Sequence, residues 1–492
     1  MNVVRWSENS LTNIMLGGEP VMELWRAWFG CVRKLKPSCT NRRTFLWMIA
    51  ILAAFSIRRE IVGVTSFIRC LGLEENCYYL LLHFFHSNAV VVPELSRLWV
   101  GLCFEIFAPF MCMLDNRILI LVDGLKIPKE GRKMPAVKLL HQESQSNSKP
   151  EYIMGQYFEC ISVLVRAAGQ YFAVPLVSRI HGGVIFSEQD EKKTLIDRVT
   201  SLVFDTIKRP HYMVADAYYA ARKIMVGLRE AGGHLITRMR SNSVAWAYPT
   251  SAERRRKKGK RGRPKTYGSK IVLRRLFDRL ERFTTARSPV YGEKNIQIRY
   301  FVLDVLLRPF AVEVRIILVA HPTRGRIILL STDRSLPALK IIEAYGLRFK
   351  IEVGFKQAIR TLGTYAYHFW MKAMEKINRR TGDQELYNKA ESYQRQVKRK
   401  LKAYMLHVQL GLISQGLLIY LSVSLKNAVW CYFGSWLRTM KTENCPSELV
   451  VSYALRSTFW DFLLNSTAER TWKKFISERV DSSRVPELRL AA

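Results

Sequence analysis

The order of strand-like and helix-like segments between residues 117 and 240 is the feature that most narrows the fold of this chain. Apolar runs rich in β-branched residues, typical of buried strands, alternate there with amphipathic patterns of helical period. In chain order, the pattern predicts strands at 117–123, 159–167 and 171–178, a helix at 191–207, a strand at 211–216, a helix at 220–232 and a strand at 234–240. This order predicts a mixed α/β sheet.

Two of these predicted strands end in an aspartate. Asp123 follows the apolar residues 118–122, and Asp216 follows the sequence HYMVA. An ionised carboxylate is costly to bury without a partner. Each acid is therefore a strand-end cap, a salt-bridge partner or a ligand, and the residues around it leave these three roles open.

The remaining sequence divides around this sheet. Further strand patterns occur at 296–307, 311–321 and 325–332, and a helix is predicted over 337–362. We expect five regions: an N-terminal helical, DNA-binding domain at 1–115, the first part of an α/β core at 116–245, a basic insertion at 246–300, the strands and helix that complete the core at 301–370, and a C-terminal helical domain at 371–492.

The charge of the chain points to a polyanionic partner. The 77 Lys and Arg residues against 41 Asp and Glu residues give a formal net charge of +36, which destabilises a compact state by self-repulsion and favours nucleic acid as a partner. The apolar run at 44–57 is shorter than the roughly 20 residues that span a bilayer. We therefore expect a cytoplasmic protein with no membrane partner. The nine cysteines show no metal-ligand spacing, so zinc is not expected.

Two segments could contact DNA. Residues 254–265 contain a run of Lys and Arg, including Arg261, Arg263 and Lys265, and such a run predicts a mobile basic loop that binds phosphates. Residues 56–87 read as two helices with a turn at Gly72. This pair is either a DNA-reading unit or ordinary helical packing, and the apolar second helix favours packing.

A charged stripe runs along the helix predicted at 337–362. At about 100° per residue, Tyr345, Arg348, Glu352, Lys356 and Arg360 share one side, and the apolar residues predict that most of the helix is buried. The stripe is either a solvated face held by i,i+4 ion pairs or part of a polar site.

Asp123, Asp216 and Glu352 together would suit two-metal phosphoryl chemistry. Two divalent cations need a shared carboxylate and further oxygen ligands. Three carboxylates without a histidine favour Mg²⁺ or Mn²⁺. We therefore expect two divalent metal ions on these three residues.

The chain resembles bacterial insertion-sequence transposases of the DDE superfamily, in the insertion-sequence-four-like branch with a Y-R-E-K signature. The resemblance rests on VDGLKIPKEG and VKLLHQESQSNSKPEYIMGQ around Asp123, VADAYYAAR at Asp216, GRPKTYG in the basic segment, and LLSTDRSLPALKIIEAYGLRFKIEVGFKQ around Glu352. Tyr345, Arg348 and Glu352 fit the signature spacing, whereas Ile359 stands where the family has Lys. Arg360 or Lys356 is then expected to supply that phosphate contact.

The resemblance implies an RNase H-like core with a β-rich insertion, flanked by helical regions. It implies a DNA transposase whose catalytic and metal-binding residues are Asp123, Asp216 and Glu352. The enzyme would cleave the ends of a mobile element and transfer the freed 3′-hydroxyl to target DNA. Double-stranded DNA and a second copy of the chain in the synaptic complex are the expected partners.

The same resemblance suggests further DNA contacts at Tyr345, Arg348, Lys126, Arg238 and Arg240. Arg238 and Arg240 are two residues apart, and we expect them to lie on one face of a strand. Trp246 is the expected base-flipping residue, because an unstacked base needs a ring to stack on; packing of this Trp onto the core is the alternative. A non-cleaving DNA-binding protein and an RNase H-like nuclease are the alternative functions.

Overall fold

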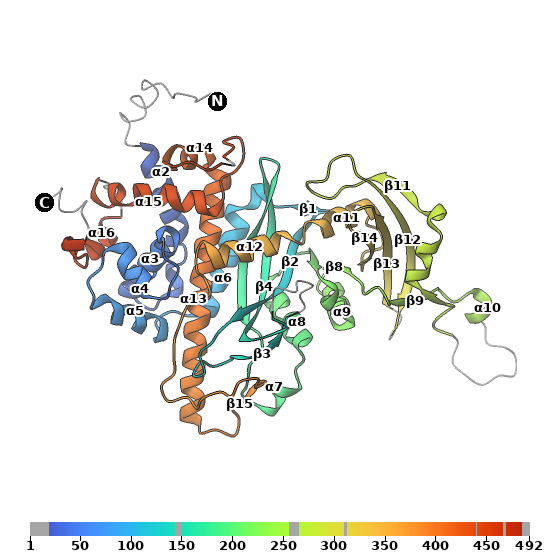
Figure 1. Cartoon of the computed structure of the whole chain (residues 1–492), viewed down its shortest axis with the longest axis horizontal. Helices are drawn as coiled ribbons and strands as arrows, with labels where there is room; N and C mark the ends of the chain where they lie inside the picture. The colour runs from blue at the N-terminus through green and yellow to red at the C-terminus, as the bar shows by residue number, and fades with distance from the viewer. Residues whose placement is uncertain are drawn as a thin grey trace.

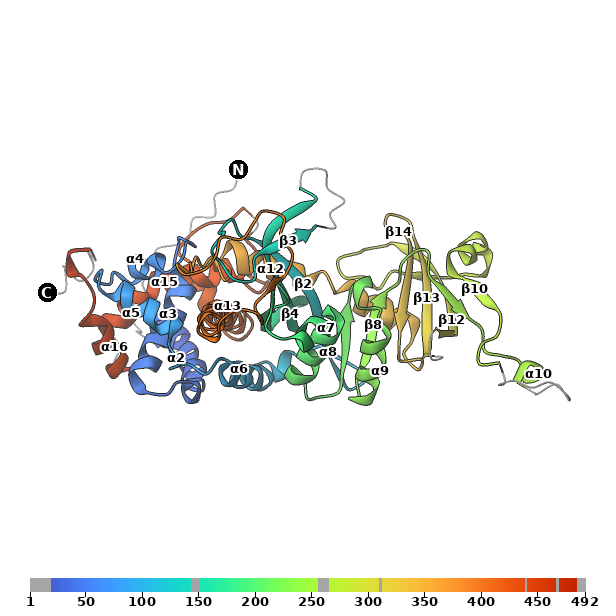
Figure 2. The ribbon, with the colours of Figure 1, turned by 90° about the horizontal axis from the view of Figure 1, so that it is seen from below.

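The computed structural model describes residues 19–142, 150–254, 265–308, 312–438, 440–465 and 469–484. A helical body lies at one end of the molecule, a β-sheet with covering helices lies in the middle, and a β-rich part lies at the other end (Figure 1). The same sequence of three parts is visible from below (Figure 2). Fold class and the flanking helical regions therefore agree with the expectation from sequence.

The core of the middle part is a five-stranded unit of RNase H-like topology. Strand β2 pairs antiparallel with β4, which pairs antiparallel with β5. On its other side β2 pairs parallel with β7, and β7 pairs parallel with β8. The bounds of the strands in this region are β1 Met113–Leu114, β2 Arg117–Pro128, β3 Lys138–His141, β4 Tyr152–Ala167, β5 Gln170–Ile180, β6 Val184–Ile185, β7 His211–Ala215 and β8 His234–Arg238.

The β-rich insertion extends the same sheet beyond β8. Strand β14 pairs antiparallel with β8, so that the described residues contain one 13-stranded sheet with the order β10-β9-β12-β13-β14-β8-β7-β2-β4-β3, to which β1, β5 and β11 add at the sides. The strands of the insertion are β9 Val244–Trp246, β10 Lys270–Val272, β11 Thr284–Arg287, β12 Gln297–Leu307, β13 Val312–His321 and β14 Gly325–Ser331. The three strand patterns seen between 296 and 332 are confirmed as β12, β13 and β14.

Helices from both ends of the chain build the helical body. Helix α13, Glu391–Ser424, packs against β5 and contacts helices of the N-terminal region and α15. It is long and apolar enough to cross a membrane by length and composition, but 89% of its most apolar stretch is buried inside the protein. The other helices here are α2 Glu19–Arg33, α3 Arg42–Ile57, α4 Thr65–Leu71, α5 Cys77–His86, α6 Val92–Ile106, α14 Lys426–Tyr432, α15 Glu448–Asn465 and α16 Arg470–Ser477, with the short strand β15 Gln384–Glu385 before α13.

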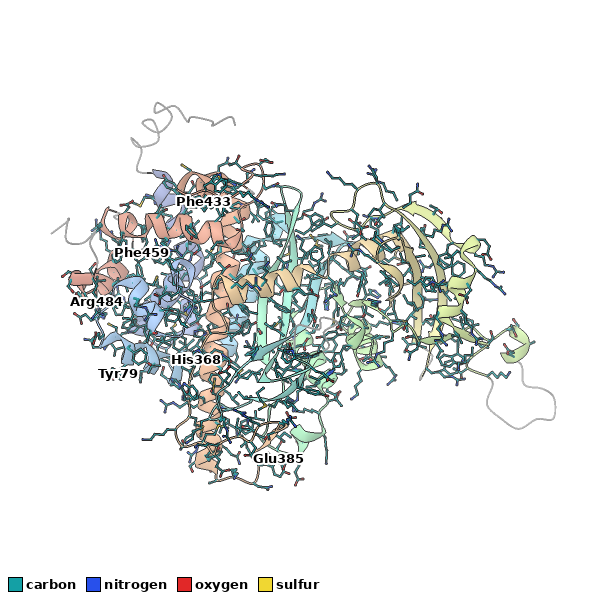
Figure 3. All side chains as sticks on the ribbon, in the orientation of Figure 1. Tyr79, His368, Glu385, Phe433, Phe459 and Arg484 are labelled. Carbon is teal, nitrogen blue, oxygen red and sulfur yellow. The ribbon has the colours of Figure 1, made fainter. Side chains whose placement is uncertain are left out.

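The helix pair around Gly72 belongs to this body. Helix α5 buries Leu81, Phe84 and Phe85 and contacts α13, while Tyr79 is 73% exposed and lies at the outer edge of the body (Figure 3). The apolar side of the second helix is therefore used for packing. This agrees with ordinary helical packing, one of the two alternatives that the sequence left open for this helix pair.

The remaining helices lie on the sheet. Helices α8 and α9 contact each other, and α9 contacts β8. Helix α11 lies on β7, β8 and β14, and α12 lies on β2 and β5. Their bounds are α7 Glu188–Lys192, α8 Leu195–Thr206, α9 Arg222–Glu230, α10 Ser251–Arg254, α11 Ala338–Gly346 and α12 Lys350–Arg360; the 3-10 turns are η1 Lys36–Ser38, η2 Ala108–Phe110, η3 Ala217–Tyr219, η4 Leu273–Asp278, η5 Leu280–Arg282 and η6 Ser482–Arg484.

Two expectations about the helix at 337–362 are wrong. The segment forms two helices, because the chain turns at residues 347–349 between α11 and α12. Apolar residues of α12 are also less buried than the periodicity predicted: Ile351 and Ala358 are buried, but Val353 is 43% and Ile359 is 38% exposed. The turn places Tyr345 and Glu352 on different helices.

Candidate active site

Asp123 lies inside a strand, so the expectation that its strand ends there is wrong. Strand β2 continues to Pro128 because β4 remains paired with it along that whole length. Parallel pairing with β7, in contrast, stops at Leu121 and Val214. Asp216 directly follows the last residue of β7. Both aspartates therefore lie just beyond the end of the parallel pairing, which brings them to the same edge of the fold.

Local hydrogen bonds set the conformation around Asp216. Asp216 is the N-cap of η3, and its Oδ1 accepts a hydrogen bond from the backbone N–H of Tyr218 at 2.8 Å. The Thr237 hydroxyl of β8 donates to the backbone carbonyl of Asp216. The end of β7 is thus fixed both by its own turn and by the neighbouring strand.

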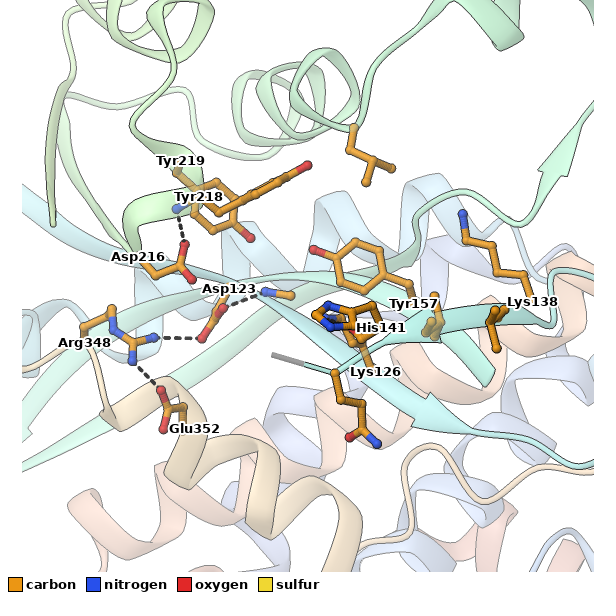
Figure 4. A pocket seen from close by; sticks show the side chains of 15 residues that line it. Asp123, Lys126, Lys138, His141, Tyr157, Asp216, Tyr218, Tyr219, Arg348 and Glu352 are labelled. Carbon is orange, nitrogen blue, oxygen red and sulfur yellow. Dashed lines mark hydrogen bonds and ion pairs between the residues drawn. The ribbon is translucent and has the colours of Figure 1, made fainter. Parts of the chain in front are cut away.

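Arg348 connects the third carboxylate to the first. It lies in the turn before α12, and Glu352 lies in the first turn of that helix. Arg348 Nη1 donates to Asp123 Oδ2 at 2.9 Å, and Arg348 Nη2 contacts Glu352 Oε1 (Figure 4). The charged stripe therefore includes the expected i,i+4 ion pair, but the same arginine also reaches Asp123.

One cavity of about 600 Å³ contains all of these groups. Asp123, Asp216, Glu352 and Arg348 line it. Sequence reasoning missed the other polar side chains around it, although two of the tyrosines lie two and three residues after Asp216 in the sequence. They are Lys138, His141, Gln142, Tyr157, Tyr218 and Tyr219.

Burial and neighbouring charges shift the pKa of Asp123. Burial raises the pKa of this carboxyl to about 6, the Arg348 guanidinium lowers it, and Asp216 and Glu352 raise it. Burial lowers the pKa of Arg348, but Asp123 and Glu352 outweigh burial and raise it overall. The three acids therefore repel one another, and Arg348 is the cation that offsets this repulsion.

A fourth acid, Glu159, is also missing from the sequence-based site. It lies on β4 opposite Gly124 and is fully buried. Its Oε1 accepts from the Tyr219 hydroxyl at 2.6 Å, and its Oε2 accepts from the Tyr157 hydroxyl at 3.1 Å. Burial raises its pKa to about 8, although both hydroxyls lower it. Glu159 is the only acid in β4, a strand composed mostly of apolar residues, and this was the available signal.

The expected DNA contacts are only partly near the cavity. Lys126 lines it and donates to the carbonyl of His141 at 2.6 Å. Tyr345 lies close by: burial raises its pKa, Arg348 and Arg238 lower it, and Asp216 raises it. Among the described residues, five other basic side chains expected to contact DNA are exposed and do not line the cavity: Arg238, Arg240, Lys265, Lys356 and Arg360. Arg261 and Arg263 lie outside the described residues.

The strand expected to carry two DNA-binding arginines carries one. Strand β8 ends at Arg238, so Arg240 lies in the loop beyond it. β8 pairs with β14 up to Arg238, and its ladder goes no further. The expectation that both arginines share one strand face is therefore wrong.

Trp246 lies far from the three carboxylates. It is on β9, which is separated from β2 by β12, β13, β14, β8 and β7. At about 4.8 Å per strand this is roughly 30 Å across the sheet. The Arg308 guanidinium lies over the Trp246 ring, 4.5 Å from its centroid, and over Tyr267 at 4.7 Å. This ring is thus packed against a cation of its own chain.

The acids fit a hard divalent cation by their chemistry. Carboxylate oxygens are the ligands that Mg²⁺ and Mn²⁺ prefer. Burial, and after it the charges of Asp216 and Glu352, raise the pKa of Asp123, and a bound cation would offset both effects. Across the described residues, no three His, Cys, Asp or Glu side chains lie close enough together to hold a metal ion as they stand. Because Arg348 bonds to two of the acids, metal binding requires these side chains to reorient.

A comparison with protein families finds a match for the central region of the chain. Residues 112–293 match the family described as DDE superfamily endonuclease. This region is similar to DDE superfamily endonucleases. It contains Asp123 and Asp216, whereas Glu352 lies beyond the matched DDE residues. Enzymes of the DDE superfamily generally use divalent metals.

The whole chain was also compared with curated proteins and with solved structures. No curated protein matches the chain. A similar solved structure is the piggyBac transposase in a cryo-EM synaptic complex with hairpin DNA; it shares 12% sequence identity, the alignment covers 91% of this chain and 78% of that chain, and the TM-score is 0.36.

Proposed function

We propose that this protein is a DNA transposase that cleaves the ends of a mobile element and joins them to target DNA by a cut-and-paste route. The observation that carries the proposal is the meeting of three acids from distant segments, Asp123, Asp216 and Glu352, at one cavity. Asp123 and Asp216 lie in the region that resembles the DDE superfamily endonucleases. In that superfamily, carboxylates at such positions serve phosphodiester chemistry.

Asp123, Asp216 and Glu352 would hold two divalent cations, Mg²⁺ or Mn²⁺. When bound, such cations activate the attacking oxygen and stabilise the leaving oxygen. When the carboxylates bind the cations, Arg348 would release them and contact a DNA phosphate instead. Its planar group of N–H donors suits a phosphate. In the proposed reaction, water attacks the phosphodiester at the element end, which leaves a 5′-phosphate on one side and a free 3′-hydroxyl on the other. That 3′-hydroxyl then attacks a phosphodiester of the target DNA, so that one P–O bond forms while the bond to the target's own 3′-oxygen breaks and that oxygen leaves as a hydroxyl.

The proposed substrate is double-stranded DNA. The proposed protein partner is a second copy of the chain in the synaptic complex. The net charge of +36 supports a polyanionic substrate. Lys126, Lys138 and His141 line the part of the cavity along β2 and β3, where they could contact phosphates beside the scissile bond. The basic segment at 254–265 would add contacts that do not depend on DNA sequence.

We also propose membership of the insertion-sequence-four-like branch. The support is the spacing of Tyr345, Arg348 and Glu352 in the sequence, together with the placement of Arg348 between two of the acids. Base flipping by Trp246 is part of this proposal, and its distance from the acids implies that it would act on DNA away from the cavity or on an end held by the second copy.

A strand-resolved cleavage assay tests the function. The substrate is a labelled duplex that carries the inverted repeats flanking the gene, with Mg²⁺, and the proteins are wild type, Asp123→Asn and Asp205→Asn. Asp205 is exposed on α8, so its variant loses the same charge outside the cavity. We expect nicking at the repeat end by wild type and Asp205→Asn, and none by Asp123→Asn.

Other outcomes identify the alternatives. Binding of the repeats by wild type without any cleavage would indicate a non-cleaving DNA-binding protein. Cleavage of RNA/DNA hybrids without joining of DNA ends would indicate an RNase H-like nuclease.

A further inference from the structure

Glu159 connects the two sides of the site. In the antiparallel pair of β2 and β4, Asp123 is opposite Cys160, and Gly124 is opposite Glu159. Because successive residues of a strand point to opposite faces, Asp123 and Glu159 face opposite sides of the sheet. Asp123 faces the side of α12 with Arg348 and Glu352, while Glu159 faces the side of the turn that follows Asp216.

Tyr219 provides the contact between this glutamate and the second aspartate. It is the last residue of η3, whose N-cap is Asp216, and its side chain is 1% exposed. Its hydroxyl donates to Glu159 Oε1 at 2.6 Å, and its backbone N–H donates to the Asp216 carbonyl at 3.2 Å. The turn that bears Asp216 is therefore attached to β4, the strand paired with the one that bears Asp123.

Tyr157 uses the other oxygen of the same carboxyl. Its hydroxyl donates to Glu159 Oε2 at 3.1 Å, and its ring crosses β2 at Gly124. A Cβ atom at Gly124 would lie 2.1 Å from the Tyr157 hydroxyl oxygen, so only glycine leaves room for this ring. Gly124 in turn donates its backbone N–H to Asp123 Oδ1 at 2.9 Å. Both aspartates thus lie next to residues that Glu159 holds in place.

We infer that Glu159 is a positioning residue, which acts through Tyr219 to hold the Asp216 turn in register with Asp123 for cation binding. This inference rests on the proposed metal-dependent function. Glu159 itself is buried and does not line the cavity, so its effect on a bound cation would be indirect. Partners of this kind typically change metal affinity by about 10- to 100-fold.

A Mn²⁺-binding measurement on the full-length protein tests the inference without a cleavage assay. The electron paramagnetic resonance signal of free Mn²⁺ reports how much of the ion is bound. We expect Glu159→Gln and Tyr219→Phe each to weaken the Asp123-dependent Mn²⁺ affinity by about tenfold. If Glu159 acts through Tyr219, the double variant should lose little more than either single variant.

Matched controls separate positioning from general loss of a buried hydrogen bond. Glu448→Gln changes another buried glutamate, which accepts from Gln415 Nε2 at 3.3 Å. Tyr365→Phe removes another buried hydroxyl, which donates to Ser178 Oγ at 3.1 Å. Both controls should keep the Mn²⁺ affinity within about twofold of wild type. Thermal unfolding, measured by circular dichroism, shows whether each variant is folded. If Glu159→Gln does not fold, the Mn²⁺ affinity of Tyr219→Phe decides the inference.

The outcomes are distinguishable. If Glu159→Gln and Tyr219→Phe bind Mn²⁺ as tightly as wild type while Asp123→Asn loses binding, the inference is wrong but the proposed metal-dependent function stands. Equal losses in the control variants also overturn the inference, because the effect would then be general. If wild type shows no Asp123-dependent Mn²⁺ binding, the proposed metal-dependent function fails and the inference fails with it.

Discussion

Arg348 Nη1 lies 2.9 Å from Asp123 Oδ2, a contact between residues 225 positions apart in the chain. The same guanidinium contacts Glu352. Arg348 is therefore both the link between α12 and β2 and the countercharge for two acids of the proposed site. Its removal should affect the charge state of Asp123 more than the fold.

We expect Arg348→Ala to slow single-turnover cleavage by at least about tenfold at pH 7. Without the guanidinium, which lowers the pKa of Asp123, that pKa should rise above about 6, so the acidic limb of the pH–rate profile should move to higher pH. Arg348→Lys should recover little, because lysine lacks the planar group that contacts two carboxylates.

Arg315→Ala is the matched control for Arg348. Arg315 forms a comparable two-point pair with Asp304 in the insertion, at 2.9 Å for each contact. Its loss should leave the pH–rate profile in place. An equal rate loss for Arg348→Ala at all pH values would argue against the electrostatic role.

Trp246 offers a second prediction. Because Arg308 lies 4.5 Å from its ring centroid, a double-mutant cycle with Trp246→Ala and Arg308→Ala should give a coupling of about 1 kcal/mol in the free energy of unfolding. A role in base flipping predicts more: a 2-aminopurine base near the repeat end should become brighter with wild type and Arg308→Ala, but not with Trp246→Ala. An unchanged fluorescence rise with Trp246→Ala would leave this Trp with packing alone.

The strand and helix order of the core was predictable because its runs are long and strongly periodic. Its pairing was not. Nothing in residues 117–128 shows that β4 pairs beyond Asp123, so the sequence pattern placed this acid at a strand end. The turn at 347–349 was missed because the helical periodicity of α11 continues into α12. Gly346, the last residue of α11, is the sequence signal for the break.

Three of the acids that line the cavity could be selected from the sequence, but their surroundings could not. Asp123 and Asp216 interrupt apolar runs, and a charge in such a place is a visible signal. Arg348 was placed on a charged stripe that faces either solvent or a polar site. Its contact with Asp123 joins residues far apart in sequence, so only the structure shows it. Tyr157 and Glu159 lie in a predicted strand or just before it, and only the register with β2 shows what they face.

Asp333 gives the molecule a predictable response to acid. Burial raises its pKa, but hydrogen bonds from Ser335 and Tyr212 outweigh burial and lower it to about 2. The Tyr212 hydroxyl donates to its Oδ2 at 2.6 Å. Because the folded-state pKa lies below the ordinary value of 3.8, the stabilisation is complete above that pH and is lost as the pH falls through about 2.

Asp333→Asn should therefore lower the free energy of unfolding by about 1–2 kcal/mol at pH 7. The difference from wild type should shrink between pH 4 and pH 2, as the wild-type carboxyl takes up its proton. Urea unfolding at a series of pH values measures this. A difference that stays constant down to pH 2 would show that the carboxylate charge is not the source of the stabilisation.

Gly416 should be the most size-sensitive position of α13. A Cβ atom there would lie 2.2 Å from Cζ2 of Trp99, whose ring is fully buried and whose Nε1 donates to the carbonyl of Pro175 at 2.9 Å. The ring cannot move away without breaking that bond, so Gly416→Ala should destabilise the protein by about 1–3 kcal/mol.

Gly101, inside α6, has no atom within 4 Å of the corresponding Cβ position. Gly101→Ala should stabilise by about 0.5–1 kcal/mol through helix propensity. Urea unfolding of both variants measures the contrast, and equal effects would mean that α13 can shift away from Trp99 at little cost.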